Sequence, residues 1–112
     1  HPYPRYPNLV KELEIMHPEK VWASDITYIH LGTGFVYLAV IMDVFISSIR
    51  GWALSTMLDQ ELTLTALHMA LMDHVPQIHH SDQGMQYAAK GYVDQLTEYQ
   101  VQISMAAEFE AH

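Results

Sequence analysis

The chain has 112 residues and a formal net charge of −8, from 13 acidic and 5 basic side chains. This length suits one compact domain with a single core. Its apolar runs are short and interrupted, so none reaches the roughly 18 to 20 residues of a membrane-spanning helix, and no membrane partner is expected. There is no cysteine and no signal-peptide pattern, which leaves a disulfide framework and export without support and favours a cytoplasmic location.

The distribution of basic residues bears on nucleic-acid binding. Arg50 is the only lysine or arginine between Val21 and Ala89. Proteins that bind nucleic acid tightly on their own usually carry a basic patch, which this stretch lacks. The acidic excess is still compatible with a metal site, because bound cations neutralise carboxylates.

The first half of the chain predicts a lead-in and three strands. Residues 1–20 hold four of the five prolines and predict an extended, partly mobile segment. Residues 21–29 and 35–43 are rich in β-branched and aromatic side chains and are separated by a glycine turn, which predicts a hairpin. Residues 47–55 predict a third strand, in which Gly51 indicates a bend, a bulge or the close approach of another backbone.

The second half predicts alternating helices and strands. Residues 58–74 predict a helix with Asp59 as its N-cap. Pro76 ends that helical pattern, and residues 77–81 predict a short fourth strand followed by a polar turn. Residues 88–100 predict a second helix, and residues 101–105 a fifth strand. This order implies one mixed α/β sheet, whose later strands run parallel to the first.

Two carboxylates in this pattern need an explanation. Asp25 lies within an otherwise apolar strand, where burying an unpaired carboxylate is costly. Asp82 follows the fourth strand, and we expect Gly84 to let the backbone turn away there. If the first and fourth strands are parallel neighbours, the two acids converge, and carboxylates are the ligands that Mg²⁺ prefers. The sequence therefore predicts a metal site, with a loop-capping role for Asp25 as the alternative.

Three stretches, DITYI, GFVYLAVIMDVFISSIRGWALS and IHHSDQGMQYA, together resemble the catalytic core of retroviral-integrase-like transposases of bacterial insertion sequences. The likeness runs from about Tyr6 to Met105. The family's first motif, W-x-x-D-I-T-Y-I, is matched by Trp22 and residues 25–29. Its second motif, H-H-S-D-x-G-x-Q-Y, is matched by residues 79–82, Gly84, Gln86 and Tyr87.

The resemblance implies an RNase H-like fold over residues 21–105, with a five-stranded mixed sheet of order 3-2-1-4-5 flanked by helices. It also implies DNA strand transfer by an Asp-Asp-Glu triad with two Mg²⁺ or Mn²⁺ ions. Asp25 would bridge both ions and Asp82 would bind one. Gln86 and Tyr87 would line the cleft that holds the DNA end, although packing of Tyr87 against the second helix is an equal expectation. The implied partners are DNA and further copies of the chain.

The family's third acid, a glutamate, would stand beyond the last residue of this sequence. Glu108 and Glu110 lie too close to Asp82 and outside a helical pattern, so we do not assign them that role. Residues 106–112 do not resemble the family. We therefore expect a C-terminally truncated core fragment that is inactive as it stands, with an apolar face left open to self-association.

Two other functions stay open at this point. One is an RNase H-like metal nuclease that hydrolyses DNA without joining strands. The other is a non-catalytic oligomerisation or binding module without metal chemistry. A zinc site is disfavoured, because the histidines at positions 68, 74, 79 and 80 follow no finger spacing and no cysteine helps.

Other conspicuous residues have simpler expected roles. His79 and His80 should point to opposite faces of their strand, one into the core and the other toward a cleft or a helix. We expect Asp43 to hydrogen-bond at a turn and Arg50 to form a salt bridge rather than to contact DNA. The large apolar side chains are expected to belong to the core and sheet faces rather than to a base-stacking platform; they are Trp22, Tyr28, Phe35, Tyr37, Met42 and Trp52.

Overall fold

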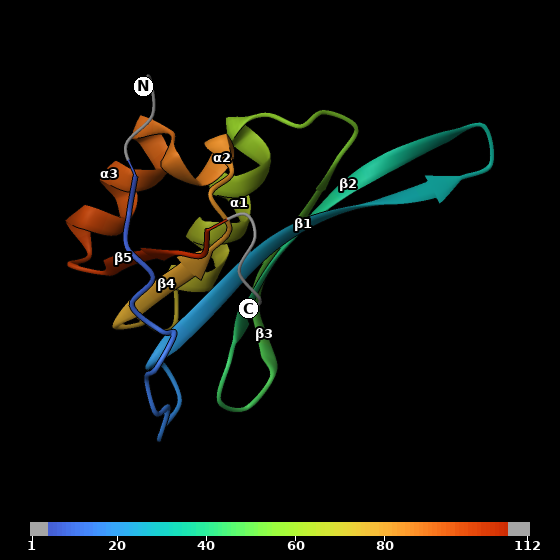
Figure 1. Ribbon diagram of the computed structural model, residues 1–112. Coiled ribbons are helices and arrows are strands. Elements are labelled where there is room, and N and C mark those ends of the chain that lie inside the picture. Colours follow the sequence, from blue (N-terminus) through green and yellow to red (C-terminus); the bar gives the residue numbers. More distant parts are fainter. Residues whose placement is uncertain (1–4, 108–112) are drawn as a thin grey trace.

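The computed structural model describes residues 5–107 of the chain, which form one sheet with helices packed on it (Figure 1). The strands are β1 (Val21–Leu31), β2 (Gly34–Asp43), β3 (Ser48–Ser55), β4 (Ile78–Ser81) and β5 (Gln102–Met105). The helices are α1 (Gln60–Leu71), α2 (Met85–Ala88) and α3 (Lys90–Glu98). The sheet has the order β3-β2-β1-β4-β5. Its first three strands are antiparallel, and β4 and β5 run parallel to β1. The expected order and the mixed α/β architecture are confirmed.

The core lies between the sheet and the helices. Alternate residues of β1 and β2 face this side, and Trp22 and Ile41 are almost fully buried against α1 residues such as Leu67. The N-cap expected at Asp59 is present, because its Oδ1 accepts a hydrogen bond from the Leu62 backbone N–H at 3.2 Å. No helix within residues 5–107 is long and apolar enough to cross a membrane.

Gly51 in β3 is explained by the close approach of α1. A Cβ atom at this position would collide with the backbone carbonyl oxygen of Ala66. The β2–β3 register also shifts here, because Ile41 pairs with Gly51 whereas Met42 pairs with Ile49. Both a bulge and a close backbone approach, two of the three alternatives for Gly51, are therefore found.

The second predicted helix differs from the one observed. In place of one helix over residues 88–100, the short α2 precedes α3, and Ala89 between them has extended backbone angles, with φ −64° and ψ 142°. In a continuous helix, side chains five positions apart would diverge by about 140° around the axis. The break lets Tyr87 and Tyr92 both pack on His79, at ring-centroid distances of 5.8 and 5.2 Å.

The N-terminal segment is less extended than expected, because bends and turns interrupt it at residues 9–12 and 17–20. It is attached to β5 and to the loop after β4. The Met105 N–H donates to the Pro7 carbonyl at 3.0 Å. The Gln83 side-chain amide donates to the Tyr6 carbonyl at 3.2 Å. The segment consequently runs beside β5 in Figure 1, at the edge of the sheet.

The β1–β2 hairpin projects beyond the rest of the sheet (Figure 1). β1 pairs with β2 as far as Leu31 but with β4 only from Val21 to Ala23. At the usual rise of a strand, the remainder of β1 extends roughly 25 Å past that pairing. Beyond Ala23, β1 has no strand of the described residues on its β4 side, whereas β3 continues beside β2 as far as Tyr37.

Candidate functional site

The two acids singled out in the sequence lie at the same place on the sheet. In the parallel β1–β4 pair, Ala23 is opposite His80. Asp25 and Asp82 each follow two residues later, one on the projecting part of β1 and the other just after β4. Both carboxylates line the same two cavities, of about 600 and 640 Å³. The structure thus brings the two acids together, while their role as metal ligands stays a prediction.

Asp25 is exposed at the cavity rather than buried, so the cost of burying its carboxylate does not arise. β1 has already passed the end of β4 at this point, so no strand covers the carboxylate on that side. Asp82 is exposed as well. Each acid receives one backbone hydrogen bond, from Ile26 N–H to Asp25 Oδ1 at 2.9 Å and from Gly84 N–H to Asp82 Oδ1 at 2.8 Å. Among the described residues, no lysine or arginine lines either cavity.

The absence of a Cβ atom matters at Gly84, as expected, but not because of its backbone angles. Its φ is −65° and its ψ is 145°, a conformation that any residue can adopt. The space around it is restrictive, because a Cβ atom would lie 2.7 Å from Asp82 Oδ1. Gly84 therefore leaves room for the carboxylate and holds it through its N–H group.

A buried hydrogen-bonded group includes Ser24, the residue before Asp25. His79 Nε2 is 2.6 Å from Ser24 Oγ and 2.8 Å from Tyr92 Oη. Complete burial lowers the pKa of His79 to about 3, so its ring is neutral at ordinary pH. The group connects β1, β4 and α3 one residue before Asp25. The sequence analysis missed Ser24 and Tyr92; a polar Ser24 beside Asp25 in an apolar strand was the available signal.

Gln86 and Tyr87 line the 600 Å³ cavity together with both acids. Tyr87 is buried and packs against Tyr92, with ring centroids 5.3 Å apart. The pKa of Tyr87 lies well above its ordinary value, chiefly because of burial and also because Tyr92, Asp25 and Asp82 are near. Tyr87 therefore packs on the helices, as one expectation had it, and borders the acid pair, while its role in holding a DNA end stays a prediction.

Aromatic side chains of the projecting hairpin form another part of the same cavity lining. Tyr28 is 61% exposed and Phe35 is 43% exposed, so of the two expected places, core and sheet face, they occupy an open sheet face. The helices do not reach this part of the hairpin, which explains the exposure. Trp52 is also exposed, on β3, whereas Trp22 is a core residue as expected.

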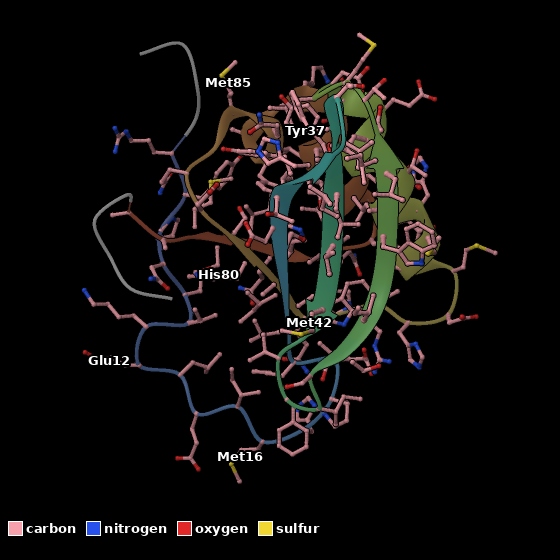
Figure 2. All side chains as sticks on the ribbon, turned by 90° about the vertical axis from the view of Figure 1, so that its right-hand side faces the viewer. Glu12, Met16, Tyr37, Met42, His80 and Met85 are labelled. Atoms are coloured by element: carbon pink, nitrogen blue, oxygen red, sulfur yellow. The ribbon has the colours of Figure 1, made fainter. Side chains whose placement is uncertain are left out.

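The second cavity lies on the opposite face of the sheet and is mainly apolar. Its lining includes Val10, Leu38 and Val40, together with His80. His80 lies on the side of the sheet that faces the N-terminal segment (Figure 2), and its Nδ1 is 2.8 Å from Ser104 Oγ. His79 and His80 therefore face opposite sides, as expected, and both are buried.

The apolar face continues onto β3. Trp52 pairs with Val40 and Leu54 pairs with Leu38, which places these exposed side chains beside the second cavity. Self-association through this face stays a prediction.

The donor set for a metal ion is limited to the acid pair. Within residues 5–107, no group of three or more histidine, cysteine, aspartate or glutamate side chains could hold a metal ion. Glu108 and Glu110 lie outside the described residues. The exposed oxygens of Asp25 and Asp82 suit a hard divalent cation such as Mg²⁺ or Mn²⁺.

Beside the start of β1, charged side chains are paired. Asp43 is fully buried and accepts hydrogen bonds from the Glu19 and Ile46 N–H groups at 2.7 and 3.0 Å. Arg50 binds both carboxylate oxygens of Glu19, at 2.9 and 2.8 Å. Burial alone would raise the pKa of Glu19, but the hydrogen bonds from Arg50 and Trp22 bring it below its ordinary value. The expected turn role of Asp43 and salt bridge of Arg50 are confirmed.

Comparison with solved structures supports the fold. The HTLV-2 integrase catalytic core domain in complex with magnesium, in its trimeric form, aligns with 80% of this chain and 60% of its own, with a TM-score of 0.72 and 19% identity. A chain of the simian T-cell lymphotropic virus intasome aligns with 98% of this chain and 38% of its own, with a TM-score of 0.77 and 19% identity. Retroviral integrase cores therefore share the RNase H-like fold of this chain.

The relatives found by sequence have a higher identity to this chain than these solved structures do. The transposase for insertion sequence element IS629 of Shigella sonnei is 41% identical over 83 residues, which cover 72% of this chain and 28% of the relative. The transposase for IS904 of Lactococcus lactis is 38% identical over 104 residues, which cover 89% of this chain and 41% of the relative. This chain thus spans well under half the length of these relatives. Residues 16–110 match the integrase core domain family. The chain belongs to the integrase core domain family, and its sequence relatives are transposases of bacterial insertion sequences.

Proposed function

We propose that this chain is the metal-binding part of a transposase catalytic core, in which Asp25 and Asp82 bind Mg²⁺ or Mn²⁺ and present it to DNA. The observation that carries the proposal is the meeting of two exposed carboxylates from neighbouring parallel strands, with no lysine or arginine of the described residues lining their cavities. Perturbed or unneutralised acids gathered in one cavity are typical of functional sites. The sequence relationship to transposases gives this site its substrate class, DNA.

The bound cations would supply charge neutralisation and Lewis acidity for DNA strand transfer. The chain's own residues keep the site in place. Gly84 fixes one oxygen of Asp82 through its N–H group. The buried contact between Ser24 and His79 holds β1 and β4 together one residue before Asp25. Gln86 lines the cavity with an amide that can hydrogen-bond to a DNA strand.

Catalysis would need more than these two acids. The described residues contain no third acidic, histidine or cysteine ligand beside the pair. Two carboxylates leave a divalent cation largely coordinated by water, so we infer weak cation binding and no strand joining by this chain alone. DNA and further copies of the chain are the partners we propose; the HTLV-2 integrase core has been solved in trimeric and dimeric forms.

Calorimetric titration with Mn²⁺ tests the proposal. We expect weak binding by the unaltered chain and loss of that binding in both Asp25→Asn and Asp82→Asn. Asp73→Asn is the matched control, because Asp73 is an exposed acid outside both cavities and the change removes the same charge. Binding that survives either site substitution, or that falls equally in the control, would contradict the proposal. No binding by the unaltered chain would instead favour a non-catalytic binding module.

The reaction is tested separately from cation binding. A DNA substrate incubated with Mn²⁺ and a longer chain that includes this core should yield joined strands. Hydrolysed strands without any joined product would favour a metal nuclease over a transposase.

A further inference from the structure

The projecting hairpin carries four aromatic rings on one face, Tyr28, His30, Phe35 and Tyr37, which we call the aromatic wall. Tyr28 is opposite Tyr37 and His30 is opposite Phe35 in the β1–β2 register. Neighbouring rings are 5.3 to 6.4 Å apart and mostly edge to face. Such contacts stabilise the rings against each other, yet they leave Tyr28 61% and Phe35 43% exposed.

The aromatic wall and the acid pair border one cavity of about 600 Å³. This volume lies within the range of pockets that bind small organic groups. Leu58 and Tyr87 contribute further apolar surface to the lining. A ligand that places a phosphate at Asp25 and Asp82 through a cation would therefore have its adjoining groups beside exposed rings.

In the part of the chain that the structure describes, the cavity has no lysine or arginine side chain that could pair with DNA phosphates. Arg50, the single basic residue between Val21 and Ala89, is bound to Glu19. In most DNA-binding surfaces such cations supply the salt-dependent affinity. Here the surfaces available to a nucleotide are the rings, the cation at the acids and a few polar groups.

We propose that the aromatic wall is a stacking site for unpaired nucleobases of the DNA strand whose phosphate lies at Asp25 and Asp82. This inference rests on the proposed function, because it takes DNA as the ligand of the acid pair. A base lies one sugar away from its phosphate, and each base presents a flat face that stacks on aromatic side chains without regard to sequence. Paired bases inside a duplex have no free face, so the wall selects frayed or single-stranded DNA.

A fluorescence titration tests the stacking site. The probe is a short single-stranded oligonucleotide containing 2-aminopurine, with Mn²⁺ present. We expect Tyr28→Leu and Phe35→Leu each to weaken binding roughly tenfold, the usual effect of losing one base–aromatic stack. Phe45→Leu is the matched control, because Phe45 is 48% exposed in the turn after β2, outside this cavity, and should leave binding unchanged. Tyr28, Phe35 and Phe45 are all exposed, so these variants should fold.

Changes in the DNA give the second half of the test. An oligonucleotide with abasic sites should bind roughly tenfold more weakly, and a blunt duplex should bind more weakly than the single strand. Equal binding of abasic and intact strands, or unchanged binding by Phe35→Leu, would overturn the stacking site. Loss of self-association in Phe35→Leu without loss of DNA binding would also overturn it, in favour of a protein contact.

The two proposals fail in different ways. Calorimetry with Mn²⁺ alone reports on Asp25 and Asp82 and does not involve the aromatic wall. If the cation binds and Asp25→Asn abolishes binding, while abasic DNA binds as well as intact DNA, the stacking site fails and the metal site stands. If no cation binds, the metal site fails first.

Discussion

Aspartates lie beside the start of β1 and near its middle, and their surroundings differ. Near its start, Asp43 of the neighbouring β2 is fully buried, and each of its carboxylate oxygens accepts a backbone N–H group. Farther along, Asp25 and Asp82 are exposed, and each receives one such bond. The first arrangement satisfies a charge that folding has removed from water, and the second leaves carboxylate oxygens available to a ligand.

This difference teaches that the position of an acid in a strand does not reveal its role. Asp43 differs from Asp25 and Asp82 in the number of its carboxylate oxygens that accept a hydrogen bond from the chain. A fully satisfied acid contributes to stability, whereas acids left open at a cavity are typical of function.

The largest expected effect is on the free energy of unfolding, when Asp43 is replaced. Asp43→Ala should lower the free energy of unfolding by about 3 kcal/mol, because it removes the fully buried acceptor of the Glu19 and Ile46 N–H groups. Asp25→Ala, at an exposed site, should change it by less than about 0.5 kcal/mol. Urea denaturation of both variants provides the measurement. Equal losses of unfolding free energy in the two variants would contradict the proposed difference between Asp43 and Asp25.

The second prediction concerns His79 of the buried hydrogen-bonded group that includes Ser24. The pKa of His79 is about 3 in the folded chain and near 6.5 when unfolded. Between these values the unfolded chain binds more protons, so stability is fully present above about pH 6.5 and falls as the pH drops toward 3.

His79→Gln should remove this contribution. The slope of unfolding free energy against pH should become shallower by up to about 1.4 kcal/mol per pH unit in that window. The groups around the ring, Tyr87, Tyr92 and Ser24, do not titrate there, and His80 is the nearby group to consider. His68→Gln, which replaces an exposed histidine outside this buried group, is the matched control. An unchanged slope in His79→Gln would contradict the predicted shift.

The smallest effect on stability is expected at Gly84. Its backbone angles suit alanine, so Gly84→Ala should change the free energy of unfolding by less than about 1 kcal/mol. The added Cβ atom would press on Asp82 Oδ1 and displace the carboxylate. Calorimetry should therefore show weaker Mn²⁺ binding with little change in the urea midpoint. Cation binding that is unaffected would argue against a positional role for Gly84.

Much of the fold was predictable because it depends on patterns of residues that are near each other in the sequence. The alternation in β1 and β2 and the Asp59 cap of α1 each act within a few residues. The end of α1 was predicted less well, because the helix stops at Leu71 rather than at residue 74. The break at Ala89 was not predictable, since neither glycine nor proline marks it. It follows from the packing of Tyr87 and Tyr92 on His79, which is a contact between distant elements.

The candidate site was predictable in its residues more than in its environment. The motifs located Asp25, Asp82, Gln86 and Tyr87, and the structure places all four around one cavity. The exposure of Asp25 depends on where β4 ends relative to β1, and the exposure of Tyr28 depends on how far the helices reach. Neither length can be read from the residues concerned.

The attachment of Pro7 to Met105 has a further consequence for the outer margins of the sheet. Unpaired backbone groups at a margin invite another strand to add on, and proteins limit this by covering or distorting it. The N-terminal segment covers the β5 margin through the Pro7 carbonyl and through Leu9, whose N–H donates to Ser104. The β3 margin is distorted by the register shift beside Gly51. Addition of a further strand is thereby discouraged at both edges, by the N-terminal segment at β5 and by the register shift at β3.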